Sequence, residues 1–462
     1  MRSVHAGGEW VEPPSPREPI KTVIPAPRAE HCFPVGFTEK PEFCIGVAAC
    51  YPTRRQSTGG IMKELLRTLI LVIAVAVILT RGAAAQTAIK VGLTGSFSGV
   101  WAALGVSMRD GVRVAVTEIN QAGGIMGKQI VLAERDDQGS PDIGVRMAGE
   151  LINQEKVVAT LGFVSTAVAL AAQPLYEAAE IPVLNNVATG SQIGHQFTPP
   201  EHKANYIFQT SANGAVQVEA IVQEAIARLH YHTPAILFET SDYGQAGRDT
   251  LKRALAAVNV KFASEQTFDI GQTDMTDQLA RAKWVNPDVI LVVGMPRELA
   301  RIADGMGVLE WKLPIMGDWM LSTSVFIDAA RYTGEGASMP QTFLQVTDTE
   351  RRGAFIAGYR RTHRVRRIDC PSAAAQGYDS VFLLKAAIEQ AESTNGPDIR
   401  AALENLRTPI EGAVTIYDRP FTRIDHEAIT ASVLVMGIVR GGHVAVAHET
   451  DTSGDRAVRV KQ

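Results

Sequence analysis

The sequence predicts an α/β protein built from two doubly wound lobes, each a parallel β-sheet between layers of helices. Short apolar runs that are typical of buried strands alternate with segments whose apolar residues recur every three or four positions, as on one helix face. One series of such units covers residues 89–187, and a second begins near residue 205. A chain of 462 residues is long enough for two domains with sizeable cores. Two series in such a chain therefore predict two lobes.

The first unit sets the pattern for the rest. Residues 89–93 form an apolar run, residues 94–99 a turn rich in glycine and hydroxyls, and residues 104–119 a helix with one apolar face. Open α/β sheets bind ligands where strands end and helices begin, so this turn is a candidate anion site. A plain turn explains its glycines equally well. Their spacing matches neither a dinucleotide fingerprint nor a phosphate-binding loop with its lysine, which argues against nucleotide binding.

The remaining units are predicted from the same signals. In the first series, strands are expected at residues 129–137, 157–163 and 181–187, and helices at 141–154 and 166–179. In the second, strands are expected at 234–239, 260–268, 289–293 and 314–316, and helices at 215–229, 244–257, 275–283 and 297–306. After residue 341 the pattern changes to helices at 350–363, 373–392 and 397–406, followed by a hairpin around Gly441 and Gly442.

Three turns in the first series carry hydroxyl groups at the ends of successive strands, at residues 94–99, 160–166 and 187–191. Ser165 or Thr166 could simply cap the helix that follows. However, the carboxyl ends of parallel strands meet at one edge of a sheet, so the three turns are expected to converge there. This convergence favours a binding site over three unrelated turns.

The first 85 residues differ from the rest of the chain. Residues 1–61 are rich in proline without apolar periodicity, which predicts a disordered leader or an over-long gene model that precedes an initiator at Met62. Residues 62–85 have a basic start, a short apolar centre and small residues before an expected cleavage after Ala85, as in a secretory signal peptide. No cysteine follows that position to carry a lipid anchor. We expect a soluble periplasmic protein.

Several function classes are disfavoured by composition. A net charge of −4 gives no reason to expect nucleic acid as a partner. His230 and His232 lie in a loop without acids or cysteines at ligand spacing, so we expect no metal. Cys370 has no base beside it, and no nucleophile–base pair is apparent elsewhere, so we expect no enzyme and no cofactor. We expect a monomer.

Four stretches resemble a known family. They are IKVGLTGSFSG, the segment EINQAGGIMG followed by a strand that ends in two aspartates, the segment LGFVSTAVALAAQPLYEAAEIPVLNNVAT, and Asp242-Tyr243-Gly244. From about residue 88 to the end, the chain resembles the periplasmic substrate-binding proteins of ABC importers, of the leucine/isoleucine/valine-binding type. This resemblance implies Rossmann-like lobes of the type I periplasmic binding protein fold, which close on a ligand in the cleft between them.

The resemblance also implies where the lobes divide. Three hinge crossings would fall near Ile207, Gln341 and Phe421. The N-terminal lobe would then comprise residues 88–206 and 342–421, and the C-terminal lobe residues 207–341 and 422–462.

The same resemblance implies the positions of the ligand-binding residues. In this family the first lobe holds the ligand carboxylate through hydroxyls and backbone N–H groups, and the matching positions are Val164, Ser165, Thr166, Val187 and Thr189. Trp101 and Leu104 match the positions that flank the ligand side chain, and Tyr243 matches the residue with which the second lobe closes over it.

One position departs from the family pattern. Amino acid binders of this family carry an acid after the Met-Gly of the second lobe, and here Trp319 aligns with that acid. Either the preceding Asp318 pairs with the ligand ammonium, or the ligand lacks an ammonium and Trp319 stacks on an aromatic ring together with Trp101. A third alternative is that Asp318 caps a helix while Trp319 fills the core. The sequence leaves all three open.

The resemblance therefore implies a binding protein that performs no chemistry. It would capture a small amphipathic ligand and deliver it to the permease of an ABC importer in the inner membrane. A branched-chain or related amino acid is the first expectation, and an aromatic carboxylate or amide is the second. A sensory ligand-binding protein is the remaining alternative.

Overall fold

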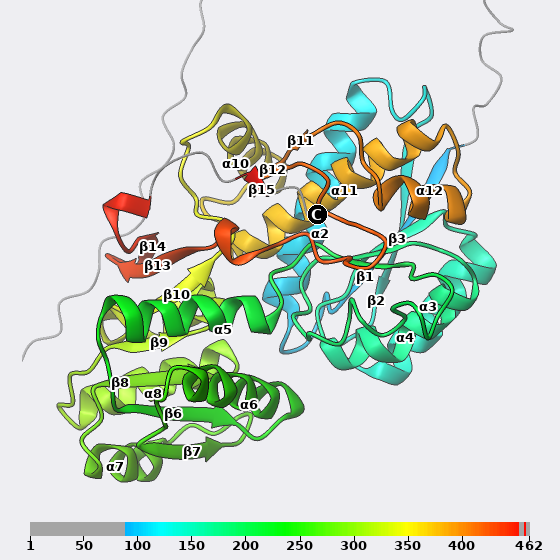
Figure 1. Ribbon diagram of the computed structural model, residues 1–462. Coiled ribbons are helices and arrows are strands. Elements are labelled where there is room, and N and C mark those ends of the chain that lie inside the picture. The colour runs from blue at the N-terminus through cyan, green and yellow to red at the C-terminus, as the bar shows by residue number, and fades with distance from the viewer. Residues whose placement is uncertain (1–87, 452–456, 459–462) are drawn as a thin grey trace, which may run out of the picture. The chain divides into compact units, whose positions relative to one another are not determined.

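The structure, a computed structural model, describes residues 88–451 and 457–458. The expected leader, residues 1–61, and the expected signal peptide, residues 62–85, lie outside the described residues. The described chain forms two doubly wound α/β lobes, as the alternation of strands and helices predicts (Figure 1).

The first sheet contains five parallel strands in the order β2-β1-β3-β4-β5. They are β1 Ile89–Gly95, β2 Ile130–Asp136, β3 Ala159–Gly162, β4 Val183–Asn185 and β5 Ile207–Gln209. Strand β5 pairs with β4, so residues 207–209 lie in the first sheet, just beyond the expected boundary. Glu427 bridges to Gln209 of β5, so the chain still runs beside this sheet past Phe421.

Helices cover both faces of the first sheet (Figure 1). Three follow its strands: α2 Ala102–Gln121, α3 Pro141–Glu150 (continued by a π turn, η1 Leu151–Glu155) and α4 Thr166–Ala178. Three come from later in the chain: α10 Glu350–His363, α11 Pro371–Ala391 and α12 Gly396–Leu403. Helix α11 packs along α2 so closely that a Cβ at Gly111 would lie 2.0 Å from the Ala374 carbonyl oxygen. The late helices therefore complete the first lobe.

The second sheet contains seven strands in the order β14-β13-β10-β9-β8-β6-β7. Its strands are β6 Pro234–Glu239, β7 Ser264–Phe268, β8 Val289–Val293, β9 Ile315–Gly317, β10 Ser338–Gln341, β13 Val435–Arg440 and β14 His443–Val446. Only β13 and β14 run antiparallel to their neighbours, and they form the hairpin expected at Gly441 and Gly442. The sequence did not predict β10, because its Pro340 lacks the N–H that a strand normally donates.

The helices of the second lobe are α5 Gly214–Val222 (continued by a π turn, η2 Gln223–Arg228), α6 Asp242–Ala257, α7 Thr276–Trp284, α8 Pro296–Val308 and the short α9 Ser324–Ala330. Alternate residues of β6 point to opposite faces. Ile236 and Phe238 share a core cluster with α5 and α6, whereas Ala235 and Leu237 share one with α7 and α8. A small third sheet joins β11 Ile410–Glu411, β12 Ile416–Tyr417 and β15 Ala457–Val458.

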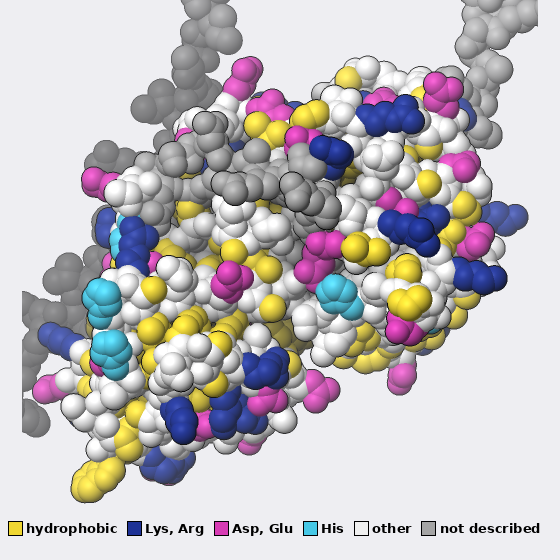
Figure 2. Space-filling model, viewed as in Figure 1, with side chains coloured by type: hydrophobic (Ala, Val, Ile, Leu, Met, Phe, Trp, Pro, Cys, Tyr) yellow, Lys and Arg dark blue, Asp and Glu magenta, His cyan; other side chains and the backbone are white. Residues whose placement is uncertain are grey.

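The surface carries charges of both signs. On the face drawn in Figure 2, lysine and arginine side chains are interspersed with aspartate and glutamate. A single-sign face of the kind that attracts nucleic acid is not seen in this view.

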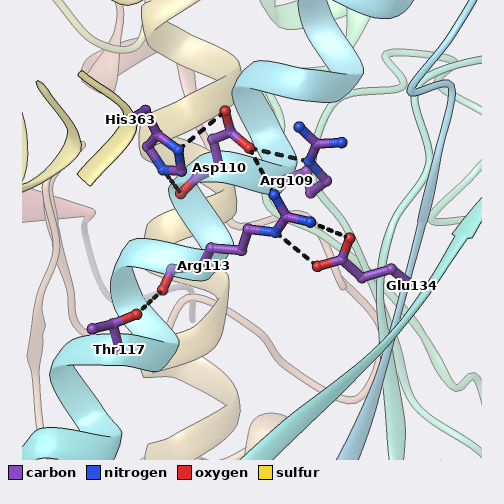
Figure 3. A network of polar contacts seen from close by, with 6 residues as sticks. All are labelled: Arg109, Asp110, Arg113, Thr117, Glu134 and His363. Carbon is purple, nitrogen blue, oxygen red and sulfur yellow. Dashed lines mark hydrogen bonds and ion pairs between the residues drawn. The ribbon is translucent and has the colours of Figure 1, made fainter. Parts of the chain in front are cut away.

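A polar network holds α10 against α2 on the outside of the first lobe (Figure 3). Asp110 of α2 forms ion pairs with Arg109 at 3.0 Å and with Arg113 at 3.5 Å, and Nδ1 of His363 in α10 lies 3.4 Å from its carboxylate. Arg113 also donates to both oxygens of Glu134 in β2, at 2.8 and 2.7 Å. Asp110 therefore connects α2 to α10, and Arg113 connects α2 to β2. Together these contacts hold the three elements in place.

Candidate functional site

A cavity of about 660 Å³ lies at the carboxyl ends of the parallel strands and is lined by residues of both lobes. Open α/β sheets bind ligands at this edge. From the first lobe, the cavity is lined by the expected residues Trp101, Leu104, Val164, Ser165, Thr166, Val187 and Thr189. From the second lobe, it is lined by Tyr243 and Asp318. Trp319 is the one expected residue that does not line it.

The polar wall of the first lobe is the amino end of α4 and the turn that faces it. Ser165 occupies the N-cap position of α4, but its hydroxyl makes no capping hydrogen bond. Thr166 Oγ1 accepts a hydrogen bond from the Gly190 backbone nitrogen at 3.1 Å, which leaves its hydroxyl proton to donate. Hydroxyl protons and N–H groups at a helix amino end together form a wall suited to an anion.

The apolar wall of the first lobe surrounds this polar group. Val164 and Val187 are buried beside it, and Leu104 and Trp101 of the first βα unit close the cavity on another side. The ring of Trp101 meets the ring of Tyr243 edge-on, with centroids 6.2 Å apart and an interplanar angle of 85°. This contact joins the two lobes at the rim of the cavity.

The second lobe contributes a partly buried carboxylate. Asp318 Oδ2 accepts a short hydrogen bond from the Tyr243 hydroxyl, and Oδ1 accepts one from the Met320 backbone nitrogen at 3.0 Å. Burial raises the pKa of Asp318 to about 6, because the ionised form loses its water, although these two hydrogen bonds oppose the shift. The negative charge of nearby Glu239 adds to it.

Tyr243 is affected in the same direction. Burial, and then the negative charge of Asp318, raise the pKa of Tyr243 well above its usual value. Tyr243 therefore stays protonated and donates to Asp318. Among the described residues, no lysine, arginine or histidine forms an ion pair with Asp318, so its charge is held by these two hydrogen bonds.

At Trp319 the structure excludes the alternative in which this side chain stacks on a ligand, and it agrees with the alternative in which Trp319 fills the core. Its side chain is only 4% exposed and packs in the core of the second lobe, so it does not stack in the cavity with Trp101. Residues 319–322 form a tight 3₁₀ turn, η3, and Asp318 caps this turn by accepting from the Met320 backbone nitrogen. Because consecutive side chains of such a turn point in different directions, Asp318 faces the cavity while Trp319 faces inward.

Residues 88–442 match the family model of periplasmic binding proteins. The chain belongs to the periplasmic binding protein family. The match covers more than half of the chain and all strands of the two large sheets except β14, so it confirms the resemblance drawn from the four sequence stretches.

Two curated relatives of this binding protein are distant but match more than half of its length. The Leu/Ile/Val-binding protein homolog 3 of Brucella melitensis is 22% identical over 331 residues, which cover 72% of this chain and 87% of the relative. The leucine-specific-binding protein of Salmonella typhimurium is 24% identical over 286 residues, which cover 62% of this chain and 75% of the relative.

Solved structures share the fold. The branched-chain amino acid transporter substrate binding protein of Streptococcus pneumoniae, in complex with isoleucine, aligns with a TM-score of 0.68 at 24% identity, over 78% of this chain and 98% of that one. An ABC transporter solute binding protein of R. palustris, in complex with benzoate, aligns with a TM-score of 0.67 at 19% identity, over 78% of this chain and 95% of that one. The binding protein therefore has the type I periplasmic binding protein fold.

The turn at residues 94–99 does not line the cavity. Ser96 Oγ donates to Asp137 at 2.7 Å, and Ser98 Oγ donates to Asp136 at 2.7 Å. The hydroxyls of this turn are therefore already bound to the acids at the end of β2. Of the three hydroxyl-bearing turns, only those near Thr166 and Thr189 converge on the cavity, and the first is a plain turn.

The sequence missed the contribution of α5. Gly214, Ala215 and Gln217 line the cavity from the amino end of this helix. Asn213 caps α5 through its side chain, which accepts from the Val216 backbone nitrogen at 2.9 Å. An asparagine followed by glycine at a helix start is a capping signal, so this helix end could have been identified in advance. Its position beside the cavity could not.

In residues 88–451 and 457–458, no cluster of three or more histidine, cysteine, aspartate or glutamate side chains is arranged to hold a metal ion. No helix in the described parts of the chain combines the length and apolar character needed to cross a membrane.

Proposed function

We propose that this periplasmic binding protein captures a small amphipathic α-amino acid, first of all a branched-chain one, and delivers it to the permease of an ABC importer. It performs no chemistry on its ligand. One observation carries the proposal: the cavity has a wall with hydroxyl and N–H groups in one lobe and a partly buried carboxylate in the other. A zwitterion satisfies both walls at once.

The carboxylate of the amino acid would lie at the amino end of α4. Thr166 keeps a hydroxyl proton free, and the uncapped Ser165 leaves N–H groups of the first helical turn available. An anion at a helix amino end gains from these donors and from the partial positive charge of the helix end.

The ammonium would lie against Asp318. A cation in a closed cleft is strongly unfavourable unless an acid pairs with it. Asp318 is an acid on the opposite wall, and it accepts hydrogen bonds from Tyr243 and the Met320 backbone without a cation beside it among the described residues. Pairing would offset the cost of burying both charges, with Tyr243 orienting the carboxylate.

The side chain would pack on Trp101, Leu104, Val164 and Val187, which are apolar and line the same cavity. Relatives named as Leu/Ile/Val-binding and leucine-specific-binding proteins support an aliphatic ligand side chain in this part of the cavity. The isoleucine complex of the structural neighbour from Streptococcus pneumoniae gives the same support.

An aromatic carboxylate is the second candidate, because a structural neighbour binds benzoate. It is less well supported by the chemistry of the cavity. Benzoate has no ammonium, so it would leave the Asp318 carboxylate buried without a cation. In addition, Trp319, the aromatic side chain expected to stack on such a ligand, lies in the core.

Calorimetric titration of the purified protein with leucine, isoleucine, valine and benzoate tests the proposal. We expect binding of the three amino acids and none of benzoate. Binding of benzoate alone would reject the amino acid assignment.

The ligand would act by shifting an equilibrium between open and closed lobes, because it touches both. The permease would recognise the closed form. We place this event in the periplasm, where proteins of this family work, with the mature chain beginning at Gln86 after export.

Replacing Thr166 by valine is expected to lower the affinity for leucine about ten- to a hundredfold, with the fold intact. Valine keeps the shape but removes the hydroxyl, and a hydrogen bond to a charged group contributes roughly 1.5–3 kcal/mol. The same loss is expected for Thr189→Val, whose residue lines the cavity beside Gly190. Calorimetry measures both. Unchanged affinity in either variant would show that its hydroxyl does not reach the ligand.

Binding of leucine is also expected to weaken in acid. Asp318 must be ionised to pair with the ammonium, and its pKa lies at about 6. The affinity at pH 5 should therefore be about tenfold lower than at pH 7. Titrations in one buffer series measure this, and a flat profile between those pH values would contradict a role for Asp318.

A further inference from the structure

The cavity continues beyond the place assigned to the amino acid. Its volume of about 660 Å³ is that of sites that hold drug-sized ligands, which are larger than leucine. The lining residues of α6 run from Tyr243 to Arg253. At a rise of about 1.5 Å per residue, this distance is roughly 15 Å along the helix. The cavity therefore extends as a groove along α6, away from the polar wall at Thr166 and from the Asp318 carboxylate.

This groove lies between α5 and α6, and we call it the α5–α6 groove. Its lining residues are Val218 and Ile221 of α5 and Ala246, Gly247, Thr250 and Arg253 of α6. Val218 and Ile221 are buried and apolar. Gly247 brings the helix close to the sheet, since a Cβ there would lie 2.6 Å from Val293 Cγ1. The groove is therefore suited to an aliphatic stem.

A cation lies at the far end of the α5–α6 groove. Arg253 donates from Nη2 to the Thr250 hydroxyl at 3.1 Å, and Thr250 lines the groove. This bond holds the guanidinium on the groove side of α6. In the region of this helix, Figure 2 shows lysine and arginine side chains interspersed with acids. Among the described residues, Arg253 has no ion pair, whereas its neighbour Lys252 pairs with Glu265 at 2.7 Å.

The acids near the groove lie in an order that complements a dipolar ligand. Asp318 and Asp242 lie at the end of the groove where the amino acid head is placed. Asp249, which lies further along, is paired with Arg248 at 3.1 Å. The groove is therefore negative at its start and positive at its end. An elongated ligand with its ammonium at the start and an anion at the far end matches both charges.

We propose that the α5–α6 groove is a second subsite, which takes the distal part of a long α-amino acid. The ligand class is an α-aminodicarboxylic acid: an amino acid head, a straight aliphatic stem and a terminal carboxylate that pairs with Arg253. This inference rests on the proposed function, because the head occupies the site between Thr166 and Asp318.

The test is calorimetry at low ionic strength with three probes: leucine, 2-aminooctanoate and 2-aminosuberate. The second and third have stems of matched length, and only the third ends in a carboxylate. We expect the affinity to increase from leucine to 2-aminooctanoate by about two- to fourfold for each methylene that the groove covers. We expect 2-aminosuberate to bind more tightly than 2-aminooctanoate.

Arg253→Ala is expected to lower the affinity for 2-aminosuberate about two- to fivefold, the usual effect of a solvent-exposed ion pair, and added salt should do the same. The variant should leave leucine and 2-aminooctanoate unaffected. Lys252→Ala is the matched control, since it removes a neighbouring cation that is paired elsewhere, and it should change none of the three affinities.

The results separate the two proposals. If neither leucine nor the two long acids bind, the proposed function itself fails. If leucine binds but 2-aminosuberate binds no more tightly than 2-aminooctanoate, the groove does not recognise a terminal anion and the inference is overturned. An equal loss in Arg253→Ala and Lys252→Ala would also overturn it, because a general charge effect would then explain the result.

Discussion

Asp318→Asn is expected to weaken the binding of leucine by about 2–5 kcal/mol, the usual effect of truncating one partner of a buried charge pair. Asparagine keeps the size of the side chain and an oxygen that accepts from Tyr243, but it cannot neutralise the ligand ammonium. Calorimetry at pH 7 measures the loss. Asp277→Asn is the matched control, because Asp277 is an exposed acid on α7 of the same lobe and does not line the cavity.

The same substitution should stabilise the ligand-free protein at neutral pH. The folded pKa of Asp318, about 6, lies above its ordinary value of 3.8, so folding favours the protonated form. The contribution of Asp318 to the free energy of unfolding is full below about pH 4 and is lost as the pH rises through about 6. Asparagine avoids this loss, which amounts to at most about 3 kcal/mol at pH 7.

Thermal unfolding therefore gives a second readout for Asp318. At pH 7 the ligand-free Asp318→Asn variant should melt above the parent protein, and the difference should shrink towards pH 4. Unchanged leucine affinity together with a lower melting temperature would show that Asp318 is only a cap for η3. Trp319→Ala, in contrast, should lower the melting temperature without changing which ligand is preferred, because Trp319 fills the core.

Asp379→Ala is expected to destabilise the first lobe by about 3–5 kcal/mol, because it leaves several buried donors without an acceptor. Asp379 is fully buried in α11 and accepts from the backbone nitrogens of Ala413 and Val414, at 2.6 and 2.9 Å, and from the Tyr417 hydroxyl at 3.0 Å. It thereby fixes residues 412–417 against the helix. Thermal or urea unfolding measures the loss.

Asp379→Asn separates the contribution of the hydrogen bonds to stability from the contribution of the charge. Burial raises the pKa of Asp379 to about 6, so at pH 7 its ionised form is held at a cost that asparagine does not have. Asp379→Asn keeps one acceptor oxygen and should destabilise much less than Asp379→Ala. Equal melting temperatures for the two variants would show that the charge, and not the set of acceptors, stabilises this region.

The sequence by itself determined the fold class. Strands and helices have different apolar periods, two and about 3.6 residues, and these periods can be read along the chain without any knowledge of its packing. The sequence also predicted that hydroxyl-bearing turns meet at one edge of the sheet, which holds near Thr166 and Thr189 but not for the turn at residues 94–99. The family, confirmed by the match over residues 88–442, followed from four local stretches.

The exact limits of the elements were less accessible. The helix expected at residues 141–154 is present but changes to π geometry after Glu150, and β10 was not predicted because Pro340 is an unusual strand residue. Strand β5 joins the first sheet although residue 207 was expected to begin the second lobe. The limits of each of these elements depend on the segments that it pairs or packs with, and those segments are distant in the sequence.

Tertiary structure alone decided the chemistry of the second wall. The sequence could not tell whether Asp318 or Trp319 faces the ligand, because they are adjacent and a single turn sets their directions. The structure places Asp318 in the cavity, where the Tyr243 hydroxyl, 75 residues away in sequence, holds it, and it places Trp319 in the core. The α5–α6 groove likewise exists only after two helices pack side by side. Periodicity fixes which residues face inward, but only the packing of distant segments fixes what they meet there.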